Sequence, residues 1–153
     1  GTLFAGLGAV YTAFLFNQAR ARDLWQTPIQ SAIHMLVHAI MAGSVVLMII
    51  APESIEWMAN ILLWGIGANI VIMAKEILMP HDTPDTKKAI HLMTKGYYSK
   101  YFWFGATYGN LGSAVILVTL SGSWALFAGV MALIGIYLTE FVRIRVPQMI
   151  PLS

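Results

Sequence analysis

Long apolar segments, separated by short polar or helix-breaking stretches, make up most of this chain. They run from Thr2 to Asn17, Pro28 to Ile50, Ile55 to Met79, Tyr98 to Leu120 and Ser123 to Val142. A membrane-spanning helix needs roughly 20 apolar residues, and four of the five segments have that length. We expect the first to be a truncated span. The pattern predicts an all-α, polytopic transmembrane helix bundle with about five spans.

Composition supports a protein embedded in lipid. Apolar residues make up 58% of the chain, charged residues only 10%, and the mean hydropathy is +0.72, whereas soluble domains carry about 25% charged residues. The net charge of +2 is small and argues against a nucleic-acid partner. The chain has no cysteine, which excludes an iron–sulfur cluster or a thiolate metal site held by it.

The beginning of the chain does not look like a natural start. Residue 1 is glycine, and the apolar stretch begins at once, without the basic region that opens a secretory signal. We therefore expect residues 1–153 to form a single membrane domain that is the C-terminal part of a longer subunit.

The basic residues indicate an orientation. They fall only between the first and second segments, around the connection between the third and fourth, and after the fifth: Arg20, Arg22, Lys75, Lys87, Lys88, Lys95, Lys100, Arg143 and Arg145. Positive charge concentrates in cytoplasmic loops. The sequence therefore predicts a multi-pass protein whose C-terminus is cytoplasmic.

The connection between the third and fourth segments predicts a short helix from Pro84 to Lys95. Thr83 is a suitable N-cap, proline suits the first helical position, and Asp85 suits the positive end of the helix dipole. One side of this helix is apolar, with Ala89, Ile90 and Met93. We expect it to lie on the cytoplasmic membrane surface, where it either contacts lipid headgroups or docks an inner partner subunit.

The second segment carries an unusual polar stripe. Gln30, His34 and His38 are four residues apart, which places them on one helix face. If Pro28 lies at the inner interface, His34 and His38 lie about 9 and 15 Å deep. Water molecules would bridge steps of about 6 Å along this ladder, and histidine changes protonation near neutral pH. The stripe predicts a proton relay; the alternative is that each histidine only bonds a neighbouring helix.

Further polar residues extend the candidate path. Glu76 is either a proton entry group or the partner of Lys75, Lys100 or Arg143, and Glu140 is spaced to pair with Arg143. Asn69 and Tyr108 lie near mid-depth, where interhelical hydrogen bonding is the alternative role for Tyr108 and for Asn110. The predicted proton path comprises Gln30, His34, His38, Asn69, Glu76, Tyr108, Glu140 and Arg143. The Gly105–Gly109 pair predicts close helix packing rather than a dimer face.

Redox and metal roles are less favoured. The remaining histidines, His81 and His91, lie in the surface connection, so no facing pair of haem ligands is evident. No carboxylate or thiolate is obviously at the depth of His34 and His38 to complete a metal site. Catalytic motifs of soluble enzymes are absent. A haem-b anchor remains one alternative, and a secondary transporter or structural membrane anchor another.

Two stretches resemble a known family. The run Tyr11–Pro28, with Gln18, Ala19, Arg22, Trp25 and Pro28 at the family's spacing, and the ending Glu140–Ser153 resemble the NrfD/polysulfide reductase membrane subunits. The helix with His34 and His38 is most similar to the version in alternative complex III, a quinol-oxidising respiratory complex.

This resemblance implies a subunit of the bacterial inner membrane that itself binds no haem, metal or iron–sulfur cluster. Its substrate would be a quinone, either menaquinone or ubiquinone, and quinol electrons would pass to an iron–sulfur subunit on the outer side. Other membrane subunits would complete the complex. Tyr11 is the candidate quinone contact, and this half would contribute a proton path from the cytoplasm to the membrane midplane.

Overall fold

The computed structural model describes residues 7–8, 11, 28–79, 84–120 and 122–149, and every regular element among them is helical. Three helices are long and apolar enough to cross a membrane. They comprise α2 (Pro28–Ile50), α3 (Ile55–Leu78) with the short 3₁₀ turn η2 (Pro52–Ser54) before it, and α7 (Trp124–Gln148). The predicted all-α bundle is confirmed.

A fourth helical rod is built from three pieces in succession. They are α5 (Ser99–Phe104), the π-helix η3 (Gly105–Gly112) and α6 (Ser113–Thr119). The sequence predicts one helix from Tyr98 to Leu120, so the extent is confirmed but the π-helical middle is new. Of the predicted first span, only Leu7, Gly8 and Tyr11 are described, and all three are helical.

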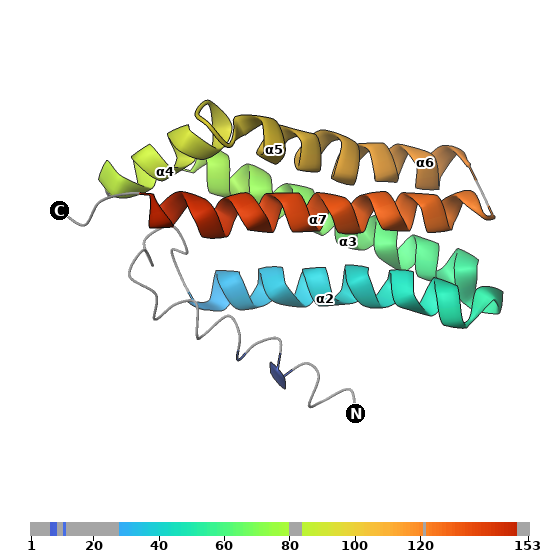
Figure 1. Ribbon diagram of the computed structural model, residues 1–153. Helices are drawn as coiled ribbons and strands as arrows, with labels where there is room; N and C mark the ends of the chain where they lie inside the picture. Colours follow the sequence, from blue (N-terminus) through green and yellow to red (C-terminus); the bar gives the residue numbers. More distant parts are fainter. Residues whose placement is uncertain (1–6, 9–10, 12–27, 80–83, 121, 150–153) are drawn as a thin grey trace.

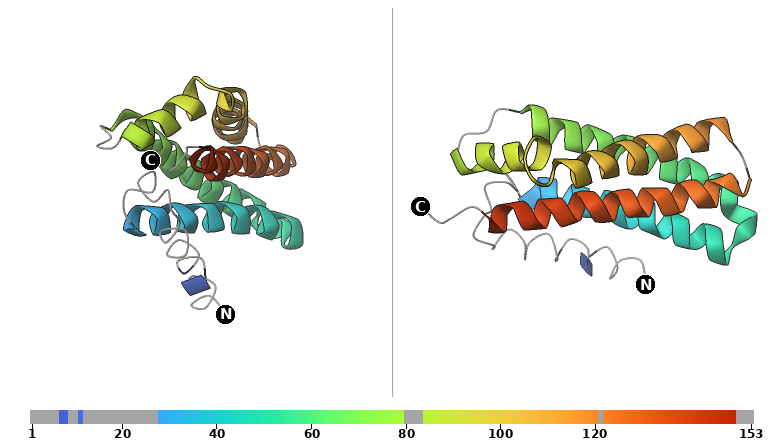
Figure 2. Two further views of the ribbon diagram at one scale, coloured as in Figure 1. Left: turned by 60° about the vertical axis from the view of Figure 1, so that its left-hand side comes forward. Right: turned by 45° about the horizontal axis from the view of Figure 1, so that its top comes forward.

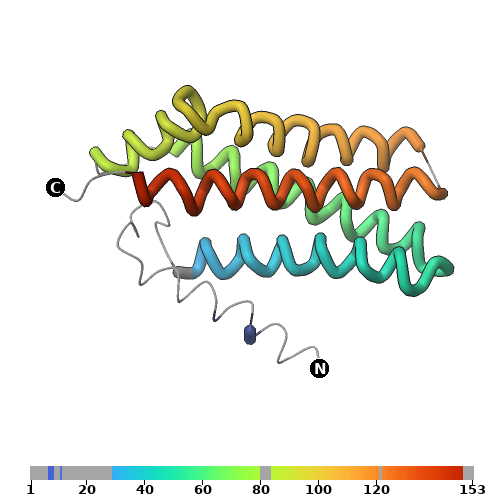
Figure 3. Tube along the Cα trace, viewed as in Figure 1, coloured from blue at the N-terminus to red at the C-terminus, as the bar shows by residue number. Residues whose placement is uncertain are grey.

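The long helices lie side by side, with α7 at the centre (Figure 1, Figure 2). Helix α7 contacts α2, α3 and all three pieces of the fourth rod, while α3 packs along α2. The start of α2 and the end of α7 lie at the same end of the bundle, as the tube in Figure 3 also shows. We call this the polar end, because it holds the ionisable residues described below.

Glycines allow the fourth rod to approach α7 closely. A Cβ atom at Gly109 would collide with the backbone of Gly135, and one at Gly105 would lie 2.9 Å from the Gly135 carbonyl oxygen. Small residues at such crossings let membrane helices gain dispersion energy from close packing. The prediction that Gly105 and Gly109 serve helix packing is confirmed.

Among the described residues, the predicted boundaries hold to within one residue except at the end of α7. Helix α7 continues past Val142 to Gln148 and so includes Arg143 and Arg145, because positively charged side chains near a helix end do not stop the backbone. The connecting helix, α4 (Pro84–Thr94), ends one residue earlier than predicted. Its expected N-cap, Thr83, lies outside the described residues.

Helix α4 also differs in what it contacts. Its apolar side packs against the bundle rather than against lipid headgroups: Ala89 and Met93 are buried in one core with Phe102 of α5 and with Val142 and Val146 of α7. The placement of the helix at the membrane surface stays a prediction, while its apolar side covers the bundle. Burying the stripe on neighbouring helices removes it from water without any lipid contact.

The opposite end of the bundle has a largely apolar core. Its buried residues come from the second half of α2 and the first halves of α3 and α7: Met41, Val45, Met48, Leu62, Ile66, Ala125 and Ala132. We call this the apolar end. Gly65 faces Met41 so closely that a Cβ there would lie 2.6 Å from the methionine Cγ, which shows how tightly α2 and α3 are packed.

Candidate functional site

Seven polar side chains from four helical elements meet at the polar end of the bundle. They are His34 and His38 of α2, Asn69 and Glu76 of α3, Asn110 of η3, and Glu140 and Arg143 of α7. We call them the polar cluster. Ionisable groups buried among spanning helices are costly and mark functional positions by default, so this cluster is the candidate site.

A chain of hydrogen bonds runs through the cluster's neutral members. The Nε2 atoms of His34 and His38 lie 2.8 and 3.1 Å from the same oxygen, Oδ1 of Asn69. The amide nitrogen of Asn69 donates to Oδ1 of Asn110 at 2.9 Å, and the Asn110 amide nitrogen donates to the Gly105 carbonyl oxygen at 3.2 Å. Both asparagines are fully buried, and satisfying their amide groups avoids a desolvation cost of about 1–3 kcal/mol for each unpaired group.

An arginine with two carboxylates forms the ionic part. Arg143 donates through Nε to Oε1 of Glu76 at 3.2 Å, and its Nη2 pairs with the other Glu76 oxygen. Its Nη1 donates to Oε1 of Glu140 at 2.8 Å. Of the three partners open for Glu76 in the sequence, Arg143 is the one that the structure selects. The predicted Glu140–Arg143 pair is confirmed.

Arg143 joins the ionic and neutral parts through His34. Its Nη1 hydrogen-bonds Nδ1 of His34 and lies 3.4 Å from the other ring nitrogen. The same residue therefore connects α7 to α2 and, through Glu76, to α3. Losing it would remove the polar link between the three helices and leave the carboxylates without their counter-ion.

The two histidines are closer than a water-bridged ladder requires. Their ring centroids are 4.2 Å apart, which is direct contact, so the expectation of a water molecule between them is wrong. Neighbouring side chains one turn apart lean toward each other when both bond the same acceptor, here Asn69. The pair acts as a unit with a single shared hydrogen-bond acceptor.

The π-helix is the feature that sequence reasoning missed. Segment η3 carries Asn110 into the cluster and its glycines onto α7. A π-helical turn changes which residues face inward, and such turns often accompany functional sites. Three glycines within eight residues, Gly105, Gly109 and Gly112, are the only local signal. They indicate a permissive backbone but not the π conformation.

Some predicted path residues lie elsewhere. Tyr108 is 60% exposed and stands beside Phe104, with ring centroids 4.9 Å apart, outside the cluster. Residues two positions apart on a helix face nearly opposite sides, so with Asn110 inside, Tyr108 faces outward. Gln30 is half-buried one turn before His34. Tyr11, the quinone candidate, is 63% exposed.

The cluster also corrects the argument about metal ligands. Glu140 lies at the depth of the histidines, with Oε1 3.8 Å from Nδ1 of His34 and 3.7 Å from Nδ1 of His38. The premise that no carboxylate shares their depth is wrong. Arg143, however, already bonds His34 Nδ1 and Glu140 Oε1. A metal ion would have to displace the Arg143 guanidinium from both atoms. These side chains are therefore better described as hydrogen-bond partners of Arg143 than as metal ligands.

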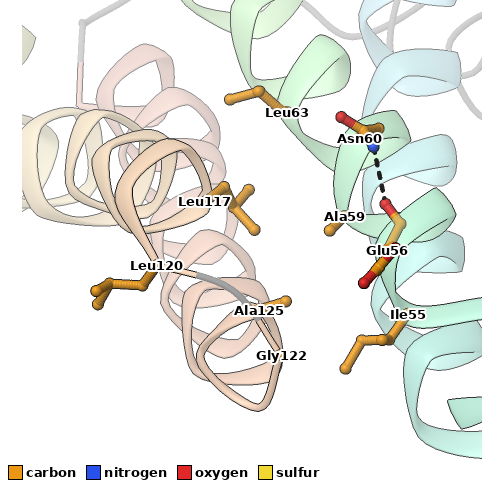
Figure 4. Close-up of a pocket in the computed structure, with 9 residues that line it drawn as sticks. All are labelled: Ile55, Glu56, Ala59, Asn60, Leu63, Leu117, Leu120, Gly122 and Ala125. Atoms are coloured by element: carbon orange, nitrogen blue, oxygen red, sulfur yellow. Dashed lines mark hydrogen bonds between the residues drawn. The ribbon is translucent and has the colours of Figure 1, made fainter.

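A shallow pocket of about 230 Å³ lies at the apolar end, between α3, α6 and the start of α7. Leu63, Leu117 and Leu120 form its apolar wall (Figure 4). Its polar members, Glu56 and Asn60, are joined within α3, where the Asn60 amide donates to the Glu56 carbonyl oxygen at 3.0 Å. The pocket shares no residue with the cluster, and Glu56 is the one ionisable residue in its lining.

Comparison with known proteins adds no assignment. No family model matches the chain, and no curated protein or solved structure matches it. The polar cluster and the sequence resemblance are therefore the two features of the chain that indicate a function.

Proposed function

We propose that this chain is the later half of a membrane subunit in a respiratory quinone oxidoreductase complex of a bacterial inner membrane. In this proposal, quinol is oxidised on the outer side and its electrons pass to an iron–sulfur partner subunit. The polar cluster serves proton movement between the cytoplasm and the membrane midplane. The chain itself would carry protons, and its partners would carry electrons.

The polar cluster is the observation that supports the proton role. Five ionisable side chains from α2, α3 and α7 meet there: His34, His38 and Arg143 are buried, Glu76 and Glu140 are half-buried, and hydrogen bonds link them directly or through Asn69. Connected ionisable groups inside a membrane protein are typical of proton relays, and histidines can give and take protons near neutral pH. A bundle that needed only adhesion could use small residues and dispersion, as the apolar end does.

The position of the cluster supports a cytoplasmic entrance. It lies at the end of the bundle that carries α4 and the last turn of α7 (Figure 1). Lys87 and Lys88 of α4 and Arg145 of α7 are exposed there, and basic residues concentrate on the cytoplasmic side. Within the cluster, Glu140 has the largest exposed fraction, 16% of its side chain. Protons would therefore enter from the inner side through Glu140.

The quinone role is supported by the family resemblance alone. In this proposal Tyr11 is the residue of this chain that contacts the quinone. Separate positions for quinol oxidation and proton uptake would let electron transfer and proton transfer occur in different parts of one subunit.

Proton pumping by the complete complex in sealed vesicles tests the proposal. His38→Leu should lower the number of protons moved per quinol oxidised while the complex stays assembled, because leucine cannot bind a proton. Tyr108→Phe is the matched control: it removes a polar group at similar depth but outside the cluster, and should leave pumping unchanged. If His38→Leu pumps like the unmodified complex, the cluster is structural and the chain is a membrane anchor.

A further inference from the structure

The hydrogen-bond chain through the asparagines has only one possible direction. A carbonyl oxygen accepts and never donates, so the Asn110 group that contacts the Gly105 carbonyl must be its NH₂. The Asn110 oxygen then faces Asn69 and accepts from the Asn69 NH₂. This leaves the Asn69 oxygen for both histidines. One backbone carbonyl thus sets the orientation of every amide in the chain.

This direction determines the tautomer of both histidines. Because the Asn69 oxygen only accepts, Nε2 of His34 and Nε2 of His38 must each carry a hydrogen. In the neutral ring the other nitrogen, Nδ1, then has a lone pair. Any additional proton must bind at Nδ1, so the surroundings of the two Nδ1 atoms decide which histidine can take it.

Both Nδ1 atoms lie near Oε1 of Glu140, at 3.8 Å for His34 and 3.7 Å for His38, but they differ in their relation to Arg143. Nδ1 of His34 accepts a hydrogen bond from Nη1 of Arg143, and a permanent cation that donates to a lone pair keeps a proton from binding it. Nδ1 of His38 faces Oε1 of Glu140 at 3.7 Å. A neutral Nδ1 and a carboxylate both accept, so neither can bond the other until a proton lies between them.

The charges of the cluster indicate how many protons it takes. Its ionisable members are His34 and His38 from α2, Glu76 from α3, and Glu140 and Arg143 from α7, while η3 adds only the amide of Asn110. With both histidines neutral, one arginine faces two carboxylates and one negative charge remains. Buried uncompensated charge is unfavourable, and a single added proton brings the cluster to neutrality.

We propose that His38 Nδ1 and the Glu140 carboxylate form a one-proton binding pair, and that His34 stays neutral as a positioning residue. On uptake, one N–H bond forms at Nδ1 of His38 with a proton from the cytoplasmic water. The imidazolium then donates to Glu140, and the pair closes from 3.7 Å toward the roughly 2.8 Å of a charge-assisted hydrogen bond. Release reverses this step. The role of the pair in transport rests on the proposed function; its protonation does not.

Nitrogen NMR of histidine side chains tests this pair in the full-length protein within its assembled complex. The protein is labelled with ¹⁵N-histidine in lipid nanodiscs, and His34→Gln and His38→Gln variants assign the signals. Across roughly pH 5–8, we expect His34 to keep a hydrogen on Nε2 and none on Nδ1. His38 should gain a hydrogen on Nδ1 as the pH falls. Titration of His34, or a neutral ring with its hydrogen on Nδ1, would overturn the inference.

Variants of Glu140 provide the second readout. Glu140→Gln removes the surplus negative charge, so His38 should remain neutral over the same range while His34 is unchanged. Glu140→Asp keeps the charge and should restore the titration of His38. A His38 that titrates in Glu140→Gln as it does in the unmodified protein would contradict the pair. The control Glu56→Gln alters an exposed carboxylate at the other end of α3 and should change neither ring.

The NMR and pumping results distinguish the two proposals. If His38 titrates as expected but His38→Leu pumps normally, the proton pair is real and the transport role is wrong. If His34 titrates instead while His38→Leu abolishes pumping, the transport role stands and the assignment of the proton to His38 is wrong.

Discussion

The two ends of this bundle are built from the same three long helices but are held together by different forces. At the apolar end, the packing is mainly between methionine, valine, leucine and isoleucine side chains, and the buried Ser44 donates to a carbonyl oxygen of its own helix. At the polar end, the same helices are joined by amides, imidazoles and one arginine with two carboxylates. Dispersion alone is sufficient to pack membrane helices, so the polar end is more elaborate than adhesion requires.

The two ends of the bundle should also differ in how well they tolerate amino-acid substitutions. An apolar contact loses energy in proportion to the atoms removed, whereas an ionic network loses far more when one member leaves its partners buried without a counter-charge. We therefore expect the largest stability effects at the polar end, although it contains fewer apolar contacts.

Arg143→Met should have the largest effect. It leaves Glu76 and Glu140 without their cation, and removing one partner of a buried ion pair costs about 3–5 kcal/mol. The measurement is the melting temperature of the purified protein. Arg145→Met is the control, because Arg145 is exposed and lies over the Phe141 ring at 5.7 Å. Equal shifts in the two variants would show that the network does not stabilise the bundle.

Met41→Ala tests the apolar end. Met41 is fully buried between α2 and α3, and truncating a buried methionine to alanine costs about 2–5 kcal/mol through lost contacts and a cavity. Ile40→Ala, at an exposed neighbouring position, should cost much less in the same thermal assay. If both substitutions cost the same, the tight packing assigned to the apolar end is not present.

Two glycine-to-alanine substitutions should change the stability of the protein in opposite directions. Gly109→Ala places a methyl group against the Gly135 backbone and should destabilise by about 1–3 kcal/mol through overpacking. Gly67→Ala meets no atom within 4 Å and should stabilise α3 by about 1 kcal/mol through helix propensity. Thermal unfolding of the two variants measures the difference. A neutral Gly109→Ala would mean that η3 and α7 are further apart than the structure shows.

The sequence predicted the helices better than their contacts. Segment Pro28–Ile50 matches α2 residue for residue. A proline marks each end of this apolar run: Pro28 begins it, and Pro52 follows it closely. Six of the seven cluster members were also in the predicted proton path, because helix rise gives the relative depths of polar residues along each span. What periodicity cannot supply is the rotation of one helix against another. For that reason Glu76 had three candidate partners, and the place of Glu140 beside the histidines was missed.

The remaining failures have similar physical causes. Tyr108 was included because of its depth, yet depth does not say which side of the rod faces inward. The π-helix η3 packs closely against α7, and local propensity does not encode such tertiary contacts. The apolar stripe of α4 was correct, but amphipathicity predicts only that the stripe is buried and not whether lipid or protein covers it.

The most direct test of the contrast between the two ends compares His38→Leu with Met41→Ala in one pumping assay. The complete complex is reconstituted in sealed vesicles, and protons moved per quinol oxidised are measured below the melting temperature of both variants. We expect His38→Leu to lower this ratio while quinol oxidation continues, and Met41→Ala to keep the ratio despite its lower stability. An unchanged ratio in His38→Leu, or an equal fall in both variants, would contradict a proton role for the polar cluster.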